Sequence, residues 1–176
     1  MKTGRTHVFV LAVLVIALLP AISGRAAEKA TFTGTETFTG VFVEPGEMTC
    51  PGHESILFPP SFCPPGTRIK LRGLIRQYFE DHSDWRATGI NTVTENWNLD
   101  ENAVGPMWGT FRLDVDSHSY WEGTWTGEWN GVVGTMKMVG HGGGDFEGLQ
   151  IRSVCDYPSM PTGTCTGEIL DPHEKK

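Results

Sequence analysis

Apolar and polar residues alternate with a period of two along most of the chain. The clearest example is the segment 120–131, in which Trp121, Trp125 and Trp129 share one parity with glycines, while threonines and glutamates occupy the other. Successive side chains of a β-strand point to opposite faces, so this segment predicts a strand with one buried and one solvated face. The alternation of very large and very small residues is typical of the interior of a small closed barrel.

Eight segments show this alternation, with turn signals between them at 81–84, 100–105, 130–131 and 141–144. We predict strands at residues 31–43, 68–80, 85–98, 107–115, 120–131, 132–140, 145–154 and 163–170. No segment of useful length shows the period of a helix. Eight is also the number of strands at which an up-and-down barrel closes around side chains or one small ligand. The sequence therefore predicts an all-β protein, an eight-stranded antiparallel β-barrel of calycin-like architecture.

The segment 44–67 loses the alternation and is rich in proline. It reads as a long loop pinned by Cys50 and Cys63. Loops of this length inside compact domains are uncommon and often cover a functional site. A plain surface excursion explains the same composition.

Residues 1–26 have the layout of a secretory signal peptide. Lys2 and Arg5 precede an apolar run at 8–22, and small residues at Gly24 and Ala26 suit cleavage after Ala26. The run is shorter than the about 20 residues that span a membrane, which favours cleavage over an uncleaved anchor. We therefore expect one domain, residues 27–176, that is secreted or periplasmic and has no membrane span after cleavage.

The exported part is acidic. Removal of residues 1–26 takes away Lys2, Arg5 and Arg25, which changes the formal net charge of the chain from −7 to −10. Such a balance repels phosphate backbones and anionic membrane surfaces. Nucleic acid is therefore not expected as a partner.

All four cysteines, Cys50, Cys63, Cys155 and Cys165, lie in the exported part. An even number in an oxidising compartment predicts two disulfides. Three pairings are open; we favour Cys50–Cys63 with Cys155–Cys165, because each bond would staple one local proline-rich excursion. A zinc site is the alternative, but no C-x-x-C pair occurs and no histidine stands at ligand spacing beside the cysteines.

Several polar residues share the parity of the apolar ones, which would place them inside the barrel. They are Glu36, Gln77, Asn91 and Glu95. An inward carboxyl group with a raised pKa would act as an acid, a base or a polar anchor. Alternatively, these residues lie at the rim, or a β-bulge reverses the parity.

The aromatic residues of the same parity would line an apolar pocket or simply fill the core. They are Phe32, Phe38, Phe42, Phe111, Trp121, Trp125 and Trp129. From the polar and aromatic sets together, the candidate ligand-binding residues are Glu36, Asn91, Glu95, Trp121 and Trp125.

Other motifs carry no chemistry of their own. The segments 81–84 and 114–118 contain aspartate and histidine, but turns favour such residues, and the calcium-loop pattern is incomplete. The glycine-rich segment 140–144 lacks the third glycine of a phosphate cradle. We therefore expect neither a metal nor a cofactor, and the common hydrolase motifs are absent.

The second half of the chain resembles the allene oxide cyclase barrel-like family. The resemblance rests on the segments Trp121–Gly127, Gly140–Gly142, Asp145–Leu149 and Gly167–Pro172, and it covers roughly residues 105–172. It implies a small exported or plastid barrel with an apolar cavity, often oligomeric, whose chemistry is mainly steric steering of a reactive intermediate. No motif carries catalytic residues of the family over to this chain.

Two functions therefore remain open. The first is a secreted barrel that binds a small apolar ligand or a partner protein. The second is an isomerase or cyclase of the allene oxide cyclase type, with Glu36 or Glu95 as a polar anchor for a hydrophobic substrate. A carboxyl group of the cavity that is both inward and desolvated would distinguish catalysis from binding. The sequence alone does not decide whether the protein is an enzyme.

Overall fold

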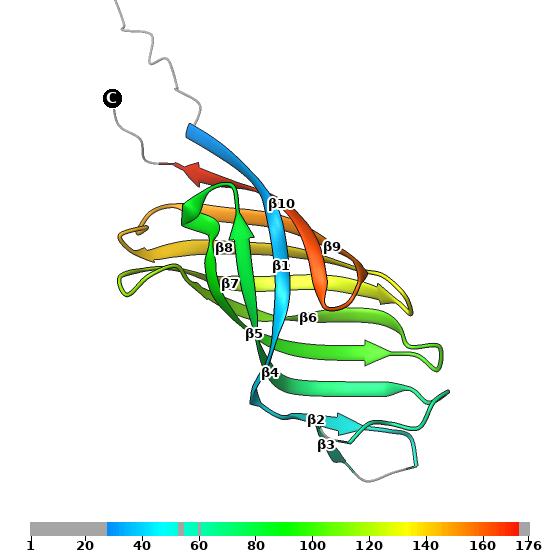
Figure 1. Ribbon diagram of the computed structural model, residues 1–176. Helices are drawn as coiled ribbons and strands as arrows, with labels where there is room; N and C mark the ends of the chain where they lie inside the picture. Colours follow the sequence, from blue (N-terminus) through cyan, green and yellow to red (C-terminus); the bar gives the residue numbers. More distant parts are fainter. Residues whose placement is uncertain (1–27, 53–54, 60, 173–176) are drawn as a thin grey trace, which may run out of the picture.

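The computed structural model describes residues 28–52, 55–59 and 61–172, and within them eight strands close an antiparallel barrel that two outer strands extend (Figure 1). The predicted signal peptide lies outside the described residues. The barrel strands are β1 (Glu28–Glu44), β4 (Ile69–His82), β5 (Gly89–Leu99), β6 (Val104–Asp114), β7 (Ser119–Asn130), β8 (Gly134–Gly144), β9 (Gln150–Ser159) and β10 (Thr162–Asp171). The predicted fold class is thereby confirmed.

The first strand closes the barrel because it pairs with neighbours on both of its edges. Glu36 lies opposite Gly163 of β10 on one side and opposite Glu80 of β4 on the other. All other barrel strands pair with their neighbours in chain order. The strand β1 therefore joins the beginning of the barrel to its end.

Alternating burial confirms the period read from the sequence. In β9 every second residue from Ile151 to Tyr157 is buried, and the residues between them are exposed. In β7 the indoles of Trp121 and Trp125 are buried in the barrel. Glycines that face the interior leave room for these large side chains; a Cβ at Gly163, for example, would meet the ring of Tyr157.

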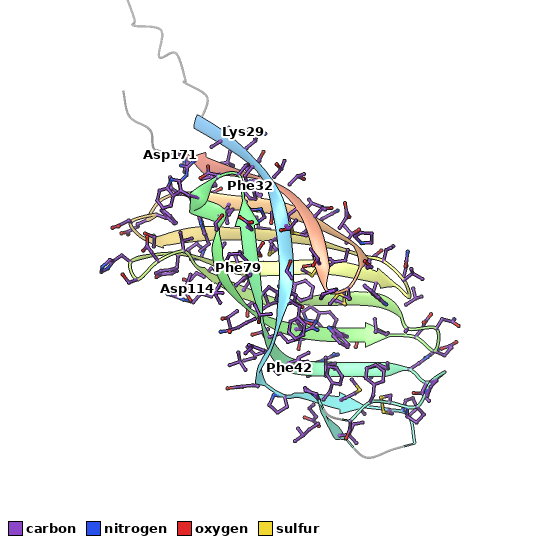
Figure 2. The ribbon with its side chains drawn as sticks, viewed as in Figure 1. Lys29, Phe32, Phe42, Phe79, Asp114 and Asp171 are labelled. Carbon is purple, nitrogen blue, oxygen red and sulfur yellow. A yellow bond between two sulfur atoms is a disulfide. The ribbon has the colours of Figure 1, made fainter. Side chains whose placement is uncertain are left out.

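A β-bulge reverses the parity within β4. The pairing with β5 shifts between Leu71 and Leu74, and Gly73 at the bulge has a φ of +67°. Such a positive φ is natural for glycine. Beyond the bulge the even positions face inward, so the prediction that Gln77 points into the barrel is wrong. Phe79, which shares its parity, is 44% exposed (Figure 2).

The segment predicted as a loop at 44–67 contains two short strands. They are β2 (Gly46–Thr49), which pairs with β4, and β3 (Ile56–Phe58), which pairs with β2. Both escape a test for alternation because they are only four and three residues long. They cover a second apolar cluster that contains Met48, Leu71 and Leu74.

Several predicted boundaries are also wrong; for example, the strand predicted from residue 85 begins at Gly89, after the 3₁₀ turn at Trp85–Ala87. Residues 141–144 belong to β8 instead of a turn, and β9 begins at Gln150 instead of residue 145. The glycines at 142–144 are needed for close packing and do not form a turn. A Cβ at any of these positions would overlap atoms of a neighbouring segment.

Both favoured disulfides are present. Cys50–Cys63 fastens the end of β2 to the segment before β4, across a separation of 13 residues. Cys155–Cys165 joins directly opposed residues of β9 and β10, and both cysteines are buried inside the barrel. The second bond therefore belongs to the core instead of a surface excursion.

The two ends of the barrel differ. At one end the short 3₁₀ turn η1 (Trp85–Ala87) accepts a hydrogen bond from the Trp121 indole at the Arg86 carbonyl, and Phe146 stacks on Trp121 with 5.1 Å between ring centroids. These contacts plug that end. The opposite end carries the β5–β6, β7–β8 and β9–β10 turns and leads into a cavity. In the described part of the chain, no helix has the length and hydropathy needed to cross a membrane.

Candidate ligand-binding cavity

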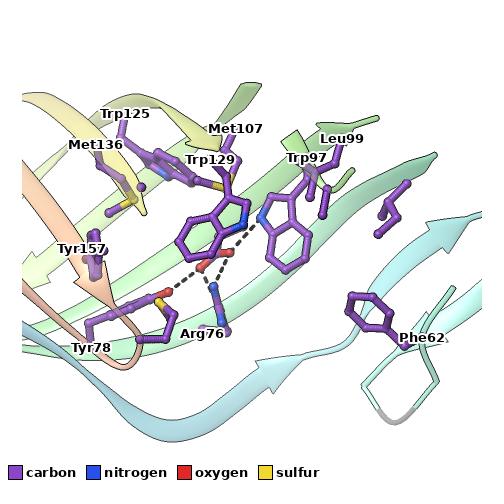
Figure 3. Close-up of a pocket in the computed structure, with 15 residues that line it drawn as sticks. Phe62, Arg76, Tyr78, Trp97, Leu99, Met107, Trp125, Trp129, Met136 and Tyr157 are labelled. Atoms are coloured by element: carbon purple, nitrogen blue, oxygen red, sulfur yellow. Dashed lines mark hydrogen bonds and ion pairs between the residues drawn. The ribbon is translucent and has the colours of Figure 1, made fainter. Parts of the chain in front are cut away.

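A cavity of about 260 Å³ enters the barrel from its unplugged end. Six of its fifteen lining residues are tryptophans or methionines. The residues of these two types are Trp97, Trp125, Trp129, Met107, Met136 and Met160. Figure 3 shows the three tryptophans projecting toward Tyr78 and Arg76, with Phe62 on the far side. Such a wall suits an apolar molecule.

The entrance lies between two segments that are distant in the sequence. Phe62 comes from the segment held by the Cys50–Cys63 disulfide, and Met160 comes from the β9–β10 turn. Both line the cavity and yet are 57% and 46% exposed. A molecule entering from solvent therefore meets these two side chains first.

Two of the three indoles of the wall present carbon faces because their N–H groups already donate to protein oxygens. Trp97 donates to Glu95 Oε2 at 3.0 Å, and Trp125 donates to the Thr94 carbonyl at 3.1 Å. A satisfied N–H offers little to a second acceptor. These two tryptophans therefore contribute apolar surface to the cavity.

Glu95 is the buried carboxylate of the cavity wall, and four donors hold it. Arg76 donates from Nε to Oε1 at 2.8 Å and from Nη2 to Oε2 at 2.5 Å. Tyr78 donates its hydroxyl to Oε1 at 2.7 Å, and Trp97 supplies the fourth bond. A carboxylate offers about four acceptor positions, so Glu95 has no acceptor capacity left for a ligand.

Arg76 balances the charge of Glu95 inside an aromatic surround. Its guanidinium lies 5.1 Å from the ring centroid of Phe38, 5.5 Å from that of Tyr78 and 5.8 Å from that of Trp97. Burial disfavours the guanidinium charge, but the attraction of Glu95 outweighs it and raises the pKa of Arg76. The pair therefore brings no net charge to the cavity wall.

A second polar cluster lies deeper in the barrel, on β1, β4 and β5. Glu80 accepts a hydrogen bond from Asn91 at 2.8 Å and pairs with Nε2 of His82 at 2.9 Å. Burial raises the pKa of Glu80 to about 8. Burial also lowers the pKa of His82. At neutral pH this cluster is therefore held together by hydrogen bonds between uncharged groups.

Glu36 is fully buried beside this cluster, and both of its oxygens lack a well-formed hydrogen bond. Burial and then the neighbouring Glu80 raise its pKa well above the ordinary value, while an interaction with the Tyr157 hydroxyl lowers it in part. Tyr157 lines the cavity, and its hydroxyl also lacks a partner of good geometry. The two residues thus connect the cavity to the buried cluster.

The structure does not bring the five predicted site residues together at one site. Glu95 and Trp125 line the cavity. Asn91 borders a much smaller space of about 10 Å³, and Glu36 lies behind the cavity wall. Trp121 packs in the plugged end against Phe146. All five are buried, and a ligand-binding role for them stays a prediction.

The sequence-based set missed Arg76, Tyr78, Glu80 and Tyr157. Simple alternation through β4 places the first three on the outer face, because it takes no account of the bulge at Gly73. Tyr157 was missed because the predicted strand ended at residue 154, whereas the alternation continues through β9 to it. The spacing of Leu71 and Leu74, three residues apart instead of two or four, is the signal that marks the bulge.

Two groups of side chains approach each other as metal ligands do, and each includes a cysteine. The groups are Glu36 with Cys155 and Cys165, and Glu80 with His82 and Cys165. Because both cysteines are in a disulfide, they offer no thiolate. As they stand, these groups do not form a metal site.

No protein-family model, curated protein or solved structure matches the chain. The barrel that the resemblance to the allene oxide cyclase barrel-like family implies is present. Membership of that family, and the oligomeric state that it implies, stay predictions.

Proposed function

We propose that this protein is an exported barrel that binds one small apolar ligand in the cavity at its unplugged end. The observation that carries the proposal is the cavity itself, which holds about 260 Å³ between tryptophan and methionine side chains. Protein interiors are normally packed with few voids larger than a water molecule. This space is therefore far larger than a single water needs.

Three further features support binding. Two disulfides suit an exported protein. Methionine and tryptophan adapt to apolar ligands, because the thioether is polarisable and the indole offers a broad face. The resemblance to the allene oxide cyclase barrel-like family points to an apolar cavity as well.

The alternative function, an isomerase or cyclase, needs a free acid or base at the wall of the cavity. Glu95 is poorly suited to act as a base, since four donors already occupy its oxygens. Glu36 lies behind Tyr157, outside the set of residues that line the cavity. Binding therefore accounts for more of the arrangement than catalysis does.

The test is titration with N-phenyl-1-naphthylamine, an uncharged apolar dye whose fluorescence rises when it leaves water. We expect saturable binding by the wild-type protein. The variant Met107→Trp, which places an indole in the half-buried rim of the cavity, is expected to weaken binding at least tenfold by filling that space.

The matched control is Val139→Trp, which adds the same indole to an exposed position of the outer wall. This variant is expected to bind the dye as the wild type does. Equal binding by both variants would place the dye outside the cavity, and no binding by the wild type would overturn the proposed function.

A further inference from the structure

We propose that the entrance of the cavity docks on a lipid surface without net charge, from which the barrel takes up its apolar ligand. The inference rests on the proposed function, because the docking surface surrounds the mouth of the same cavity. It adds the partner that supplies the ligand and the residues that contact this partner.

Exposed apolar side chains gather around the entrance from several separate segments. They come from the end of β1, from β3, from the segment before β4, from the start of β6, and from the β7–β8 and β9–β10 turns. We call these residues the apolar rim: Phe42, Leu57, Phe62, Val104, Val132 and Met160. Val132 is 71% exposed and Leu57 is 58% exposed. Apolar side chains that gather in one exposed region mark a site of contact with a protein or a membrane.

A chain of aromatic contacts connects the apolar rim to the wall of the cavity. The ring centroid of Phe58 lies 6.3 Å from that of Phe42 and 5.4 Å from that of Phe62. It also lies 5.8 Å from that of Trp97, which lines the cavity. Apolar surface therefore continues from the rim into the barrel. A molecule that enters here from a lipid surface exchanges one apolar environment for another.

The charges beside the apolar rim favour a lipid surface without net charge. Arg68 pairs with Glu101 at 3.3 Å, and Arg72 of β4 lies opposite Glu47 of β2. The chain is also acidic as a whole. Anionic lipids are held by clusters of lysine and arginine that no acidic residues balance. Docking at this rim therefore depends on apolar contact and not on attraction between charges.

The chemistry of the ligand favours a lipid surface over a protein as the partner. A molecule that suits an apolar cavity leaves water for lipid, so a lipid phase is its store. A second copy of the chain seated on the rim would cover the entrance and bring no ligand. The rim residues also stand at turns and strand ends, from which their side chains enter the interface of a membrane without a complementary protein surface.

The test is flotation of the protein with phosphatidylcholine vesicles, which carry no net charge. We expect the wild type to float with them, and to bind vesicles that also contain phosphatidylglycerol no more strongly. Leu57→Asp and Val132→Asp alter the rim at two separate segments, and neither residue lines the cavity. Each variant is expected to lower the partition into phosphatidylcholine vesicles at least about fivefold, because the contact loses one apolar side chain.

Val139→Asp is the matched control, because it places the same charge at an exposed position of the outer wall. It is expected to float as the wild type does. Without vesicles, all three variants are expected to bind N-phenyl-1-naphthylamine as the wild type does. This dye binding shows that Leu57→Asp and Val132→Asp are folded and keep the cavity, so their loss of flotation reports on docking alone.

The outcomes also distinguish this inference from the proposed function. If the wild type binds the dye but does not float, or floats only when phosphatidylglycerol is present, the lipid partner is overturned and the cavity remains a binding site. Equal flotation of Leu57→Asp and Val139→Asp overturns the role of the rim. A wild-type dimer in sedimentation that Leu57→Asp dissociates, without flotation, assigns the rim to a second copy and overturns the lipid partner. If the wild type does not bind the dye at all, the proposed function itself is overturned.

Discussion

At the scale of single residues, Glu80 and Glu95 show two ways to bury a carboxyl group in one barrel. Glu95 forms an ion pair with Arg76 and accepts hydrogen bonds from two further residues. Glu80 has no cation of that kind and is held by Asn91 and His82. Burying an unpaired charge is costly, so Glu80 takes up a proton instead.

The raised pKa of Glu80 predicts how stability depends on pH. The folded protein holds this proton up to a pKa of about 8, whereas the unfolded chain releases it near the ordinary value of 4.5. Between these pH values the folded state binds more protons, so the free energy of unfolding falls as the pH rises. The contribution is fully present below about pH 4.5 and falls by at most about 1.4 kcal/mol for each pH unit until about pH 8.

The measurement is urea unfolding of the wild type and of Glu80→Gln between pH 5 and pH 8. Glutamine keeps both hydrogen bonds and cannot ionise, so this variant is expected to show the smaller decrease with pH. Because Glu80 also raises the pKa of Glu36, the comparison isolates what Glu80 contributes both directly and through its effect on Glu36. Glu122→Gln, on the outer wall, is the control; parallel pH profiles for all three proteins would contradict the assigned protonation.

At the scale of elements, the bulge in β4 decides which side chains form the cavity. Without the extra residue near Gly73, Arg76, Tyr78 and Glu80 would point to solvent, as simple alternation predicts. The one-residue shift in register thus moves the cation of the cavity, Arg76, and the hydroxyl of Tyr78 from one side of the wall to the other.

Gly73→Ala tests this bulge. A Cβ at this position would meet nothing within 4 Å, so the cost comes from the backbone φ of +67° alone. We expect a loss of about 1–2 kcal/mol in the free energy of unfolding, measured with urea. Gly73→Asn is expected to lose less, because asparagine tolerates this region. An alanine variant as stable as the wild type would show that the bulge does not require the left-handed conformation.

The same bulge explains how much of the cavity the sequence alone could predict. Alternation over eight segments was enough for the barrel, because nearly every strand has one buried face. It also placed Glu36, Asn91 and Glu95 inside, where the structure has them. It failed for Arg76 and Tyr78, since parity carries no information across an insertion that shifts the register.

The hydrogen-bond partners of the buried polar residues could not be predicted from the sequence either. The four hydrogen bonds on Glu95 come from three residues on two strands, and all three are aromatic or basic residues that are ordinary at exposed positions too. The contact between Glu36 and Tyr157 joins the first strand to the ninth. Such pairs depend on register and twist, which a single sequence does not specify.

At the scale of the whole molecule, one end of the barrel is closed by packed side chains and the other contains the cavity. The plugged end holds stacked aromatic rings, and the other end holds the cavity and its entrance. Phe146, which is 4% exposed, belongs to the first, and Phe62, which is 57% exposed, belongs to the second. Stability and binding should therefore respond to different substitutions.

We expect Phe146→Ala to lower the free energy of unfolding by about 3–5 kcal/mol and to leave the affinity for N-phenyl-1-naphthylamine unchanged. Phe62→Ala is expected to change stability by less than about 1 kcal/mol, because its ring is largely exposed, and to weaken dye binding. Urea unfolding and dye titration of both variants give the comparison. The separation of stability from binding would be contradicted if Phe146→Ala weakened dye binding or if Phe62→Ala caused a large loss of stability.

The closure of the barrel by its first strand has a consequence for orientation. Glu28 of β1 lies opposite Asp171 of β10, so both ends of the described chain leave the barrel side by side, at the plugged end (Figure 1). The cavity opens about the length of a strand away. A tether joined to either end would therefore hold the plugged end toward its support and present the entrance outward, free to sample the surrounding medium.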